Sequence, residues 1–183
     1  YADLALPEAL MDRVQEWLGP TDAVWHSAEH KLTFPSGASV SFGYLETQKD
    51  KYRYQSAAFQ YIAFDELTQF AEDRYRYLFS RLRRPDGLGG TVPLARVPLR
   101  MRAASNPGGL GHEWVKQRFL TEGAAKGRVF IPAKLGDNPY LDQEEYRQSL
   151  AELDPVTRAQ LLNGDWAART AGGVFRREWF EIV

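Results

Sequence analysis

Two adjacent acidic residues, Asp65 and Glu66, follow a short apolar run and could do chemistry together. The run occupies residues 59–64, and its length fits a strand that is covered on both faces. Neighbouring side chains point in different directions, so one carboxylate can hold a metal ion while the other faces a water molecule. This arrangement suits nucleotide hydrolysis and fits a Walker B strand followed by a catalytic glutamate. An ordinary helix start explains the same pair.

A second candidate strand, residues 97–104, ends at the polar pair Ser105 and Asn106. In open α/β sheets, ligands bind beyond the carboxyl ends of the strands. In a phosphate-handling site, such short hydrogen-bonding side chains can sense the γ-phosphate or the attacking water. The alternative is a plain turn through Pro107 and the glycines that follow it.

The elements that must position these residues alternate between helices and strands. Helices are predicted at residues 7–18, 71–83, 112–120, 142–153 and 155–162, and strands at 59–64, 97–104 and 128–131. Residues 30–34 and 38–44 are predicted to form a half-buried hairpin, with Ala38, Val40 and Phe42 inward. The predicted buried faces are Leu10, Val14, Trp17 and Leu18 on the first helix and Tyr75, Leu78, Phe79 and Leu82 on the second. The alternation indicates an α/β fold with a mainly parallel central sheet and a hairpin insertion.

The composition excludes several classes of site. The chain has 183 residues, 44% of them apolar, which is enough for one domain with a proper core. It has no cysteine, which removes disulfide scaffolds, cysteine zinc sites and thiol nucleophiles, and its three histidines make a histidine-rich metal site improbable. No apolar run approaches the roughly 20 residues that span a bilayer. The start at Tyr1 shows no initiator Met and no signal segment, so we expect a fragment.

The net charge of −1 conceals an uneven distribution. Residues 74–102 hold eight arginines and one acidic residue, a local charge of +7, whereas residues 137–154 hold six acidic residues and one arginine, a local charge of −5. The basic block, with Arg81, Arg83 and Arg84 as candidates, can follow a phosphate backbone or contact a neighbouring subunit. A helix with a solvated arginine face is the alternative. The acidic segment is expected to form a solvated face, which could complement the basic block on a neighbouring subunit.

Four separated segments resemble the large terminase subunit of tailed bacteriophages, a family of DNA-packaging motors. They are YLETQKDKYRYQSAAFQYIAFDELTQF at residues 44–70, SNPGGLGHEWVKQRF at 105–119, DNPYL at 137–141 and LDPVTRAQLLNGDW at 153–166. They follow one another in the order that the family shows.

The resemblance implies a role for each matched residue. Asp65 corresponds to the Walker B aspartate that helps to coordinate Mg²⁺, and Glu66 to the catalytic glutamate. Ser105 and Asn106 correspond to the coupling motif, which links the state of the nucleotide to the movement of DNA. Arg53 resembles the arginine that reaches the ATP of a neighbouring subunit as a trans finger. The family often has glycine where this chain has Tyr54, and an exposed loop cation is the alternative for Arg53.

The resemblance also implies a fold and a domain order. Residues 1–166 are expected to form part of a three-layer P-loop-NTPase-like ATPase domain, and residues 167–183 the linker and start of an RNase H-like nuclease domain. The phosphate loop ending in Gly-Lys-Ser/Thr is absent from the chain. Residues 87–90 lack the lysine, and residues 108–111 precede His112 instead. We therefore expect the chain to begin downstream of the first strand and phosphate loop, and to be inactive alone.

The function implied by the resemblance is ATP hydrolysis that drives double-stranded DNA into a preformed capsid. Its cofactors would be ATP and Mg²⁺. Its partners would be double-stranded DNA, further copies of the chain in a ring, the portal protein and the small terminase subunit, with no membrane. It would work in the host cytoplasm, transiently docked on the procapsid. The alternatives are a non-catalytic prophage remnant, a fragment that keeps only assembly or DNA contacts, or a metal-dependent nuclease, which would need a third carboxylate.

Overall fold

The computed structural model describes residues 9–84 and 97–168, and the chain divides into two compact units. The first unit comprises Tyr1–Ile62 and Arg76–Met101, and the second comprises Ala63–Tyr75 and Arg102–Val183. The chain passes from one unit to the other within β4 (Tyr61–Phe64), α2 (Glu72–Phe79) and β5 (Arg100–Ala103). Residues 87–90, which lack the lysine of a phosphate loop, and residues 169–183 of the predicted linker lie outside the described residues. The domain boundary expected at residue 166 stays a prediction.

The first unit begins with α1 (Leu10–Leu18) and a three-stranded antiparallel sheet. Its strands are β1 (Val24–His26), β2 (Lys31–Thr33) and β3 (Ser39–Ser41), in that order. The predicted hairpin is confirmed as β2 and β3, with Thr33 opposite Ser39 and Gly37 at a φ of 85° in the turn. Glycine tolerates that φ without steric cost, so the turn can be tight. Strand β1 was not predicted from the sequence.

Two predicted buried faces in this unit are only partly right: Val14, Leu18 and Phe42 are half-buried, whereas the other members are exposed. Leu10 and Trp17 on α1 are exposed, Trp17 to 69%, and the buried residue of the helix is Met11. The inward face of α1 therefore contains Met11, Val14 and Leu18, and Met11 takes the place that was predicted for Leu10. Val40, expected inside the hairpin, is exposed, and all of β3 is exposed.

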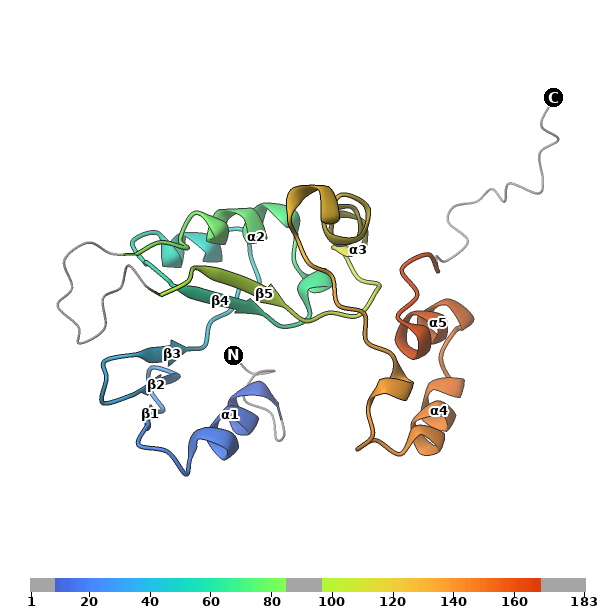
Figure 1. The fold of residues 1–183 in the computed structure, drawn as a ribbon, viewed down its shortest axis with the longest axis horizontal. Coiled ribbons are helices and arrows are strands. Elements are labelled where there is room, and N and C mark those ends of the chain that lie inside the picture. The colour runs from blue at the N-terminus through green and yellow to red at the C-terminus, as the bar shows by residue number, and fades with distance from the viewer. Residues whose placement is uncertain (1–8, 85–96, 169–183) are drawn as a thin grey trace. The chain divides into compact units, whose positions relative to one another are not determined.

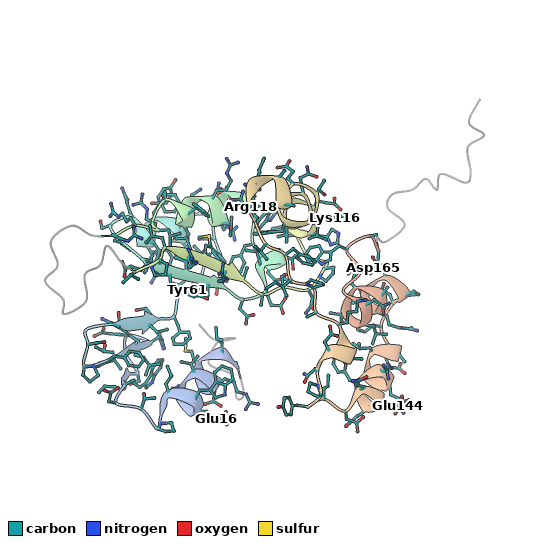
Figure 2. The ribbon with its side chains drawn as sticks, viewed as in Figure 1. Glu16, Tyr61, Lys116, Arg118, Glu144 and Asp165 are labelled. Atoms are coloured by element: carbon teal, nitrogen blue, oxygen red, sulfur yellow. The ribbon has the colours of Figure 1, made fainter. Side chains whose placement is uncertain are left out.

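The strands β4 and β5 form a two-stranded parallel sheet (Figure 1). Arg100 N–H donates to the Gln60 carbonyl and Ala104 N–H to the Phe64 carbonyl, each over 3.0 Å, so the pairing advances in the same direction along both strands. Both strands were predicted, with longer bounds. Coverage on both faces of β4 is not found, because Ile62 and Phe64 are buried whereas Tyr61 is 58% exposed (Figure 2). The three-layer fold stays a prediction.

Helix α2 ends at Phe79, four residues before its predicted end. Arg83 N–H donates to the Phe59 carbonyl and Phe59 N–H to the Arg81 carbonyl, both over 2.9 Å. These bonds make a parallel bridge of Leu82 to Phe59, and the chain must leave the helix to form it. Tyr75 and Leu78 are buried as predicted, whereas Phe79 is exposed.

The second unit is mostly helical. Helix α3 (His112–Val115) continues as a π-helix, η5 (Lys116–Thr121), followed by the short 3-10 helices η6 (Ala124–Lys126) and η7 (Leu135–Asp137). Helices α4 (Gln143–Ala151) and α5 (Pro155–Asn163) confirm the last two predicted helices. The strand predicted at residues 128–131 is wrong. No strand of the described part pairs with it, and Val129 and Ile131 are 76% and 81% exposed.

An aromatic cluster around Tyr75 forms the core of the second unit. Its ring centroid lies 5.4 Å from that of Phe64 on β4 and 5.2 Å from that of Trp114 on α3. The Arg118 guanidinium lies over the Tyr75 ring, 5.0 Å from its centroid. Such aromatic contacts add to the burial of apolar area, and here they hold the end of β4 against α3.

Candidate functional site

The end of β4 carries Asp65 and Glu66, as the sequence predicted. Both are exposed, and Asp65 Oδ1 accepts a 3.1 Å hydrogen bond from Glu66 N–H. Glu66 has a φ of 49°, in the left-handed region that non-glycine residues seldom adopt. Strain of this kind persists only where the surroundings hold the backbone in place. The chain reverses at Glu66 and enters the 3-10 helix η3 (Leu67–Gln69).

The end of β5 is hydrogen-bonded to η3. Leu67 N–H donates to the Ala104 carbonyl over 3.0 Å, and Thr68 N–H donates to Ser105 Oγ over 3.0 Å. Thr68 Oγ1 lies 2.9 Å from Ser105 Oγ and donates to the Asn106 carbonyl over 3.0 Å. The structure therefore brings Glu66, Ser105 and Asn106 together at one edge of the sheet, as the strand ends predicted.

Thr68 was not among the site residues predicted from the sequence. Its exposed fraction is 1%, and Leu67 before it is equally buried. The sequence gives no signal that Thr68 connects the two strand ends, because its hydrogen-bond partners Ser105 and Asn106 lie 37 and 38 positions further along the chain. Only the pairing of β4 with β5 brings them within reach.

The glycines after Asn106 allow the backbone to approach η3 closely. Gly111 N–H donates to the Thr68 carbonyl over 2.6 Å, and a Cβ at Gly111 would lie 2.7 Å from the Phe70 carbonyl oxygen. Gly108 and Gly109 have φ values of 107° and 75°. The segment therefore packs closely against η3 of the protein itself.

A pocket of about 350 Å³ opens beside this edge of the sheet. Its walls come from the turn at Glu66, from the glycine segment after Asn106 and from α5, which contributes Gln160. Asp65 and Ser105 do not line it. Gln160 was not predicted as a site residue. Its Nε2 donates to the Ala168 carbonyl over 2.9 Å, and its Oε1 lies so near Gly108 that a Cβ there would be 2.9 Å away.

Helix α5 is held in place by Asp154, its N-cap residue. Asp154 Oδ1 accepts from Val156 N–H and Thr157 N–H, each over 3.0 Å. The hydrogen bond from the Thr157 side chain, followed by those from the amides, holds the pKa of Asp154 below its usual value. The carboxylate is therefore the form that stabilises the start of α5.

Arg53 lies in the 3-10 helix η2 (Asp50–Tyr54), within the first unit. Its Nη1 donates to the Tyr44 hydroxyl, and its guanidinium lies 4.7 Å from the centre of the Tyr44 ring. Tyr54 OH accepts from Tyr44 N–H and donates to the Tyr44 carbonyl, each over 3.1 Å. Tyr54, the departure from the family pattern, therefore fixes the residue against which Arg53 rests. Arg53 does not line the pocket described above.

Arg81, Arg83 and Arg84 also belong to the first unit. Each donates to a backbone carbonyl: Arg81 to Gln55, Arg83 to Ser56 and Arg84 to Val97. These bonds leave the positive charge in place, so a contact with phosphate is compatible with them and stays a prediction.

The described residues contain no group of three or more His, Cys, Asp or Glu that could hold a metal ion. Mg²⁺ bound together with substrate phosphates needs only one or two carboxylates. Asp65 fits that lesser requirement, since Oδ1 bonds the Glu66 amide and the exposed carboxylate keeps a second oxygen. No helix in the described ranges is long and apolar enough to cross a membrane.

Comparison with known proteins gives one family. Residues 17–87 match the family model described as terminase large subunit, T4likevirus-type, N-terminal. No curated protein and no solved structure gives a significant match. The matched residues include Arg53, Asp65 and Glu66, together with the whole of β4 and α2. Residues 17–87 are therefore similar to the N-terminal part of phage large terminase subunits.

Proposed function

We propose that this chain is part of an ATP-hydrolysing motor that moves double-stranded DNA into a procapsid. The family match supports a role in phage DNA packaging. One observation favours ATP hydrolysis: Glu66 and Asn106, which follow two neighbouring parallel strands, line the same pocket. Ligands of open α/β sheets bind at this edge.

The pocket residues have the chemistry that phosphoryl transfer to water needs. A water oxygen forms a bond to the γ-phosphorus while the bond from that phosphorus to the β–γ bridging oxygen breaks, which releases ADP and phosphate. The Glu66 carboxylate orients the water and accepts its proton. The Asn106 amide can donate to a phosphate oxygen and report whether the γ-phosphate is present.

Asp65 would hold Mg²⁺ through its exposed carboxylate. When bound, the ion neutralises charge on the β- and γ-phosphates. Glu66 would thus act on the water, and Asp65 would hold the ion. This division agrees with their positions, because Glu66 lines the pocket and Asp65 does not.

Arg53 is proposed as a finger that reaches the nucleotide of a neighbouring copy. In this structure the Arg53 guanidinium lies over the Tyr44 ring and donates to the Tyr44 hydroxyl. A phosphate of a neighbouring copy's nucleotide can take the place of Tyr44, because it accepts stronger, charge-assisted hydrogen bonds from the guanidinium. The motor would then work as a ring on double-stranded DNA, with the portal protein and the small terminase subunit as partners. We place it in the host cytoplasm, docked transiently on the procapsid.

The test is ATP hydrolysis by the intact subunit that carries this segment, because the 183 residues contain no Gly-Lys-Ser/Thr loop. We expect Glu66→Gln to lower kcat at least 100-fold, because Gln keeps the shape but accepts no proton. The matched control is Glu113→Gln, an exposed glutamate of the same unit that does not line the pocket. Equal turnover in Glu66→Gln and wild type would reject the proposal.

A further inference from the structure

The residue that connects the two strand ends is Thr68, which is 1% exposed and uses every polar group it has. Its amide donates to Ser105 Oγ, its hydroxyl donates to the Asn106 carbonyl, and its carbonyl accepts from Gly111 N–H. All three partners lie on the single segment that follows β5. A buried polar side chain with complete hydrogen bonding fixes its neighbours closely.

The hydroxyls of Thr68 and Ser105 and the Asn106 carbonyl form one compact group. Thr68 Oγ1 lies 3.0 Å from the Asn106 carbonyl oxygen and 2.9 Å from Ser105 Oγ, and Ser105 Oγ lies 3.1 Å from the same carbonyl oxygen. The two hydroxyl protons are shared among these three contacts, and either hydroxyl can be the donor between Thr68 and Ser105. Ser105 Oγ also accepts from Thr68 N–H, so the Ser105 hydroxyl is engaged with Thr68 and with the backbone of its own neighbour.

The backbone of Glu66 depends on the same contacts. Its φ of 49° is unfavourable for glutamate, and the segment that follows is held by Leu67 N–H on the Ala104 carbonyl and by Thr68. Glu66 and Asn106 both line the pocket, and Thr68 lies two residues from the first and bonds the backbone of the second. Its hydroxyl thus sets the distance between the two groups.

We propose that Thr68 is a positioning residue: its hydroxyl holds the Asn106 backbone against the turn that carries Glu66, so that both side chains reach the γ-phosphate end of one nucleotide. This inference rests on the proposed ATPase. It assigns Ser105 a structural part in the same contact, in which the hydroxyl bonds Thr68 and the nucleotide is met by Asn106. Thr68 itself transfers no proton to the substrate.

The experiment compares Thr68→Val and Thr68→Ser in the intact subunit, with kcat and KM for ATP measured separately. Val keeps the shape and removes the hydroxyl, whereas Ser keeps the hydroxyl. We expect Thr68→Val to lower kcat at least 10-fold with KM within twofold of wild type, because positioning of the reacting groups acts on the transition state. Thr68→Ser should stay within threefold of wild type in kcat. Ser105→Ala removes the partner oxygen and should share the Thr68→Val phenotype, so it serves if Thr68→Val does not fold.

A control separates positioning from loss of stability. Leu150→Ala removes a buried side chain of α4 that does not line the pocket, and it should lower the melting temperature while kcat at 25 °C stays within twofold. The inference is overturned if Leu150→Ala lowers kcat as much as Thr68→Val does. It is also overturned if Thr68→Val and Ser105→Ala keep wild-type kcat while Glu66→Gln is inactive. That result would still agree with the proposed ATPase. Wild-type turnover in Glu66→Gln would instead reject the ATPase and, with it, this inference.

Discussion

Thr68 Oγ1 lies 2.9 Å from Ser105 Oγ, although 37 positions of the chain separate the two residues. The contact joins the turn after β4 to the turn after β5, and both turns line the same pocket, the first with Glu66 and the second with Asn106 among other residues. The buried hydroxyl of Thr68 therefore links the backbone at Asn106 to the turn that carries Glu66.

Close packing at Gly111 predicts a clear loss of stability on substitution. In Gly111→Ala the new Cβ would lie 2.7 Å from the Phe70 carbonyl oxygen and 2.9 Å from that of Thr68. Both are backbone atoms and cannot turn away, so we expect the free energy of unfolding to fall by about 1–3 kcal/mol. Gly136→Ala is the control, because nothing lies within 4 Å of a Cβ there. Urea unfolding measures both variants, and equal stability of the two would contradict the packing at Gly111.

The proposed trans role of Arg53 predicts complementation. Arg53→Ala subunits keep Glu66 and Glu66→Gln subunits keep Arg53, so each alone should hydrolyse ATP poorly. In a mixed ring, some sites pair an intact Glu66 with an intact Arg53 from the neighbour, and ATPase activity should return in part. The measurement is turnover at several mixing ratios with the total subunit concentration held constant. If no ratio exceeds the sum of the separate activities, Arg53 does not act across the interface.

The three arginines Arg81, Arg83 and Arg84 predict a salt effect on DNA binding. Replacing all three by glutamine keeps side-chain donors for the Gln55, Ser56 and Val97 carbonyls but removes the charges. The slope of log K against log salt concentration should become shallower by about 0.9 for each DNA phosphate that the variant no longer neutralises. Replacement by lysine is the charge-preserving control. An unchanged slope in the glutamine variant would favour a solvated face or a subunit contact.

Asp154 predicts a pH-dependent contribution to the stability of α5. Hydrogen bonds from the Thr157 side chain and amide lower the pKa of Asp154 in the folded chain below 3.8. The stabilisation is therefore complete above that value and is lost as the pH falls through the lower, folded-state pKa. The melting temperature of wild type should exceed that of Asp154→Ala at pH 7, and the gap should narrow below pH 3.8. Asp154→Asn, which keeps a cap without a charge, should stay close to wild type at pH 7. A gap that is equal at pH 7 and pH 3 would contradict this role of the carboxylate.

The strand ends of the candidate site could be predicted from the sequence because local signals mark them. An apolar run precedes Asp65, and polar and turn-forming residues from Ser105 onward interrupt the second strand. The parallel pairing of β4 and β5 then followed from the helix between them. Helices α4 and α5 were also predicted, and the structure shows that Asp142 and Asp154 cap them.

The failures share a different cause, which is contact with residues distant in the chain. Residues 128–131 have the composition of a strand, but pairing decides whether a strand forms, and no described strand pairs with them. Helix α2 stops early because Leu82 bridges Phe59. Thr68 and Gln160 show no local signal, since their importance comes from Ser105, Asn106 and Gly108 beside them.

The most direct test of the proposed site is a structure of the intact subunit bound to Mg²⁺ and a non-hydrolysable ATP analogue. The quantities to measure are the distances from the γ-phosphate and its nearest water to Glu66 and Asn106. The proposed function predicts that the Glu66 carboxylate lies within hydrogen-bond distance of that water and the Asn106 side chain within the same reach of the γ-phosphate. A nucleotide bound away from the pocket that Glu66, Asn106 and Gln160 line would contradict it.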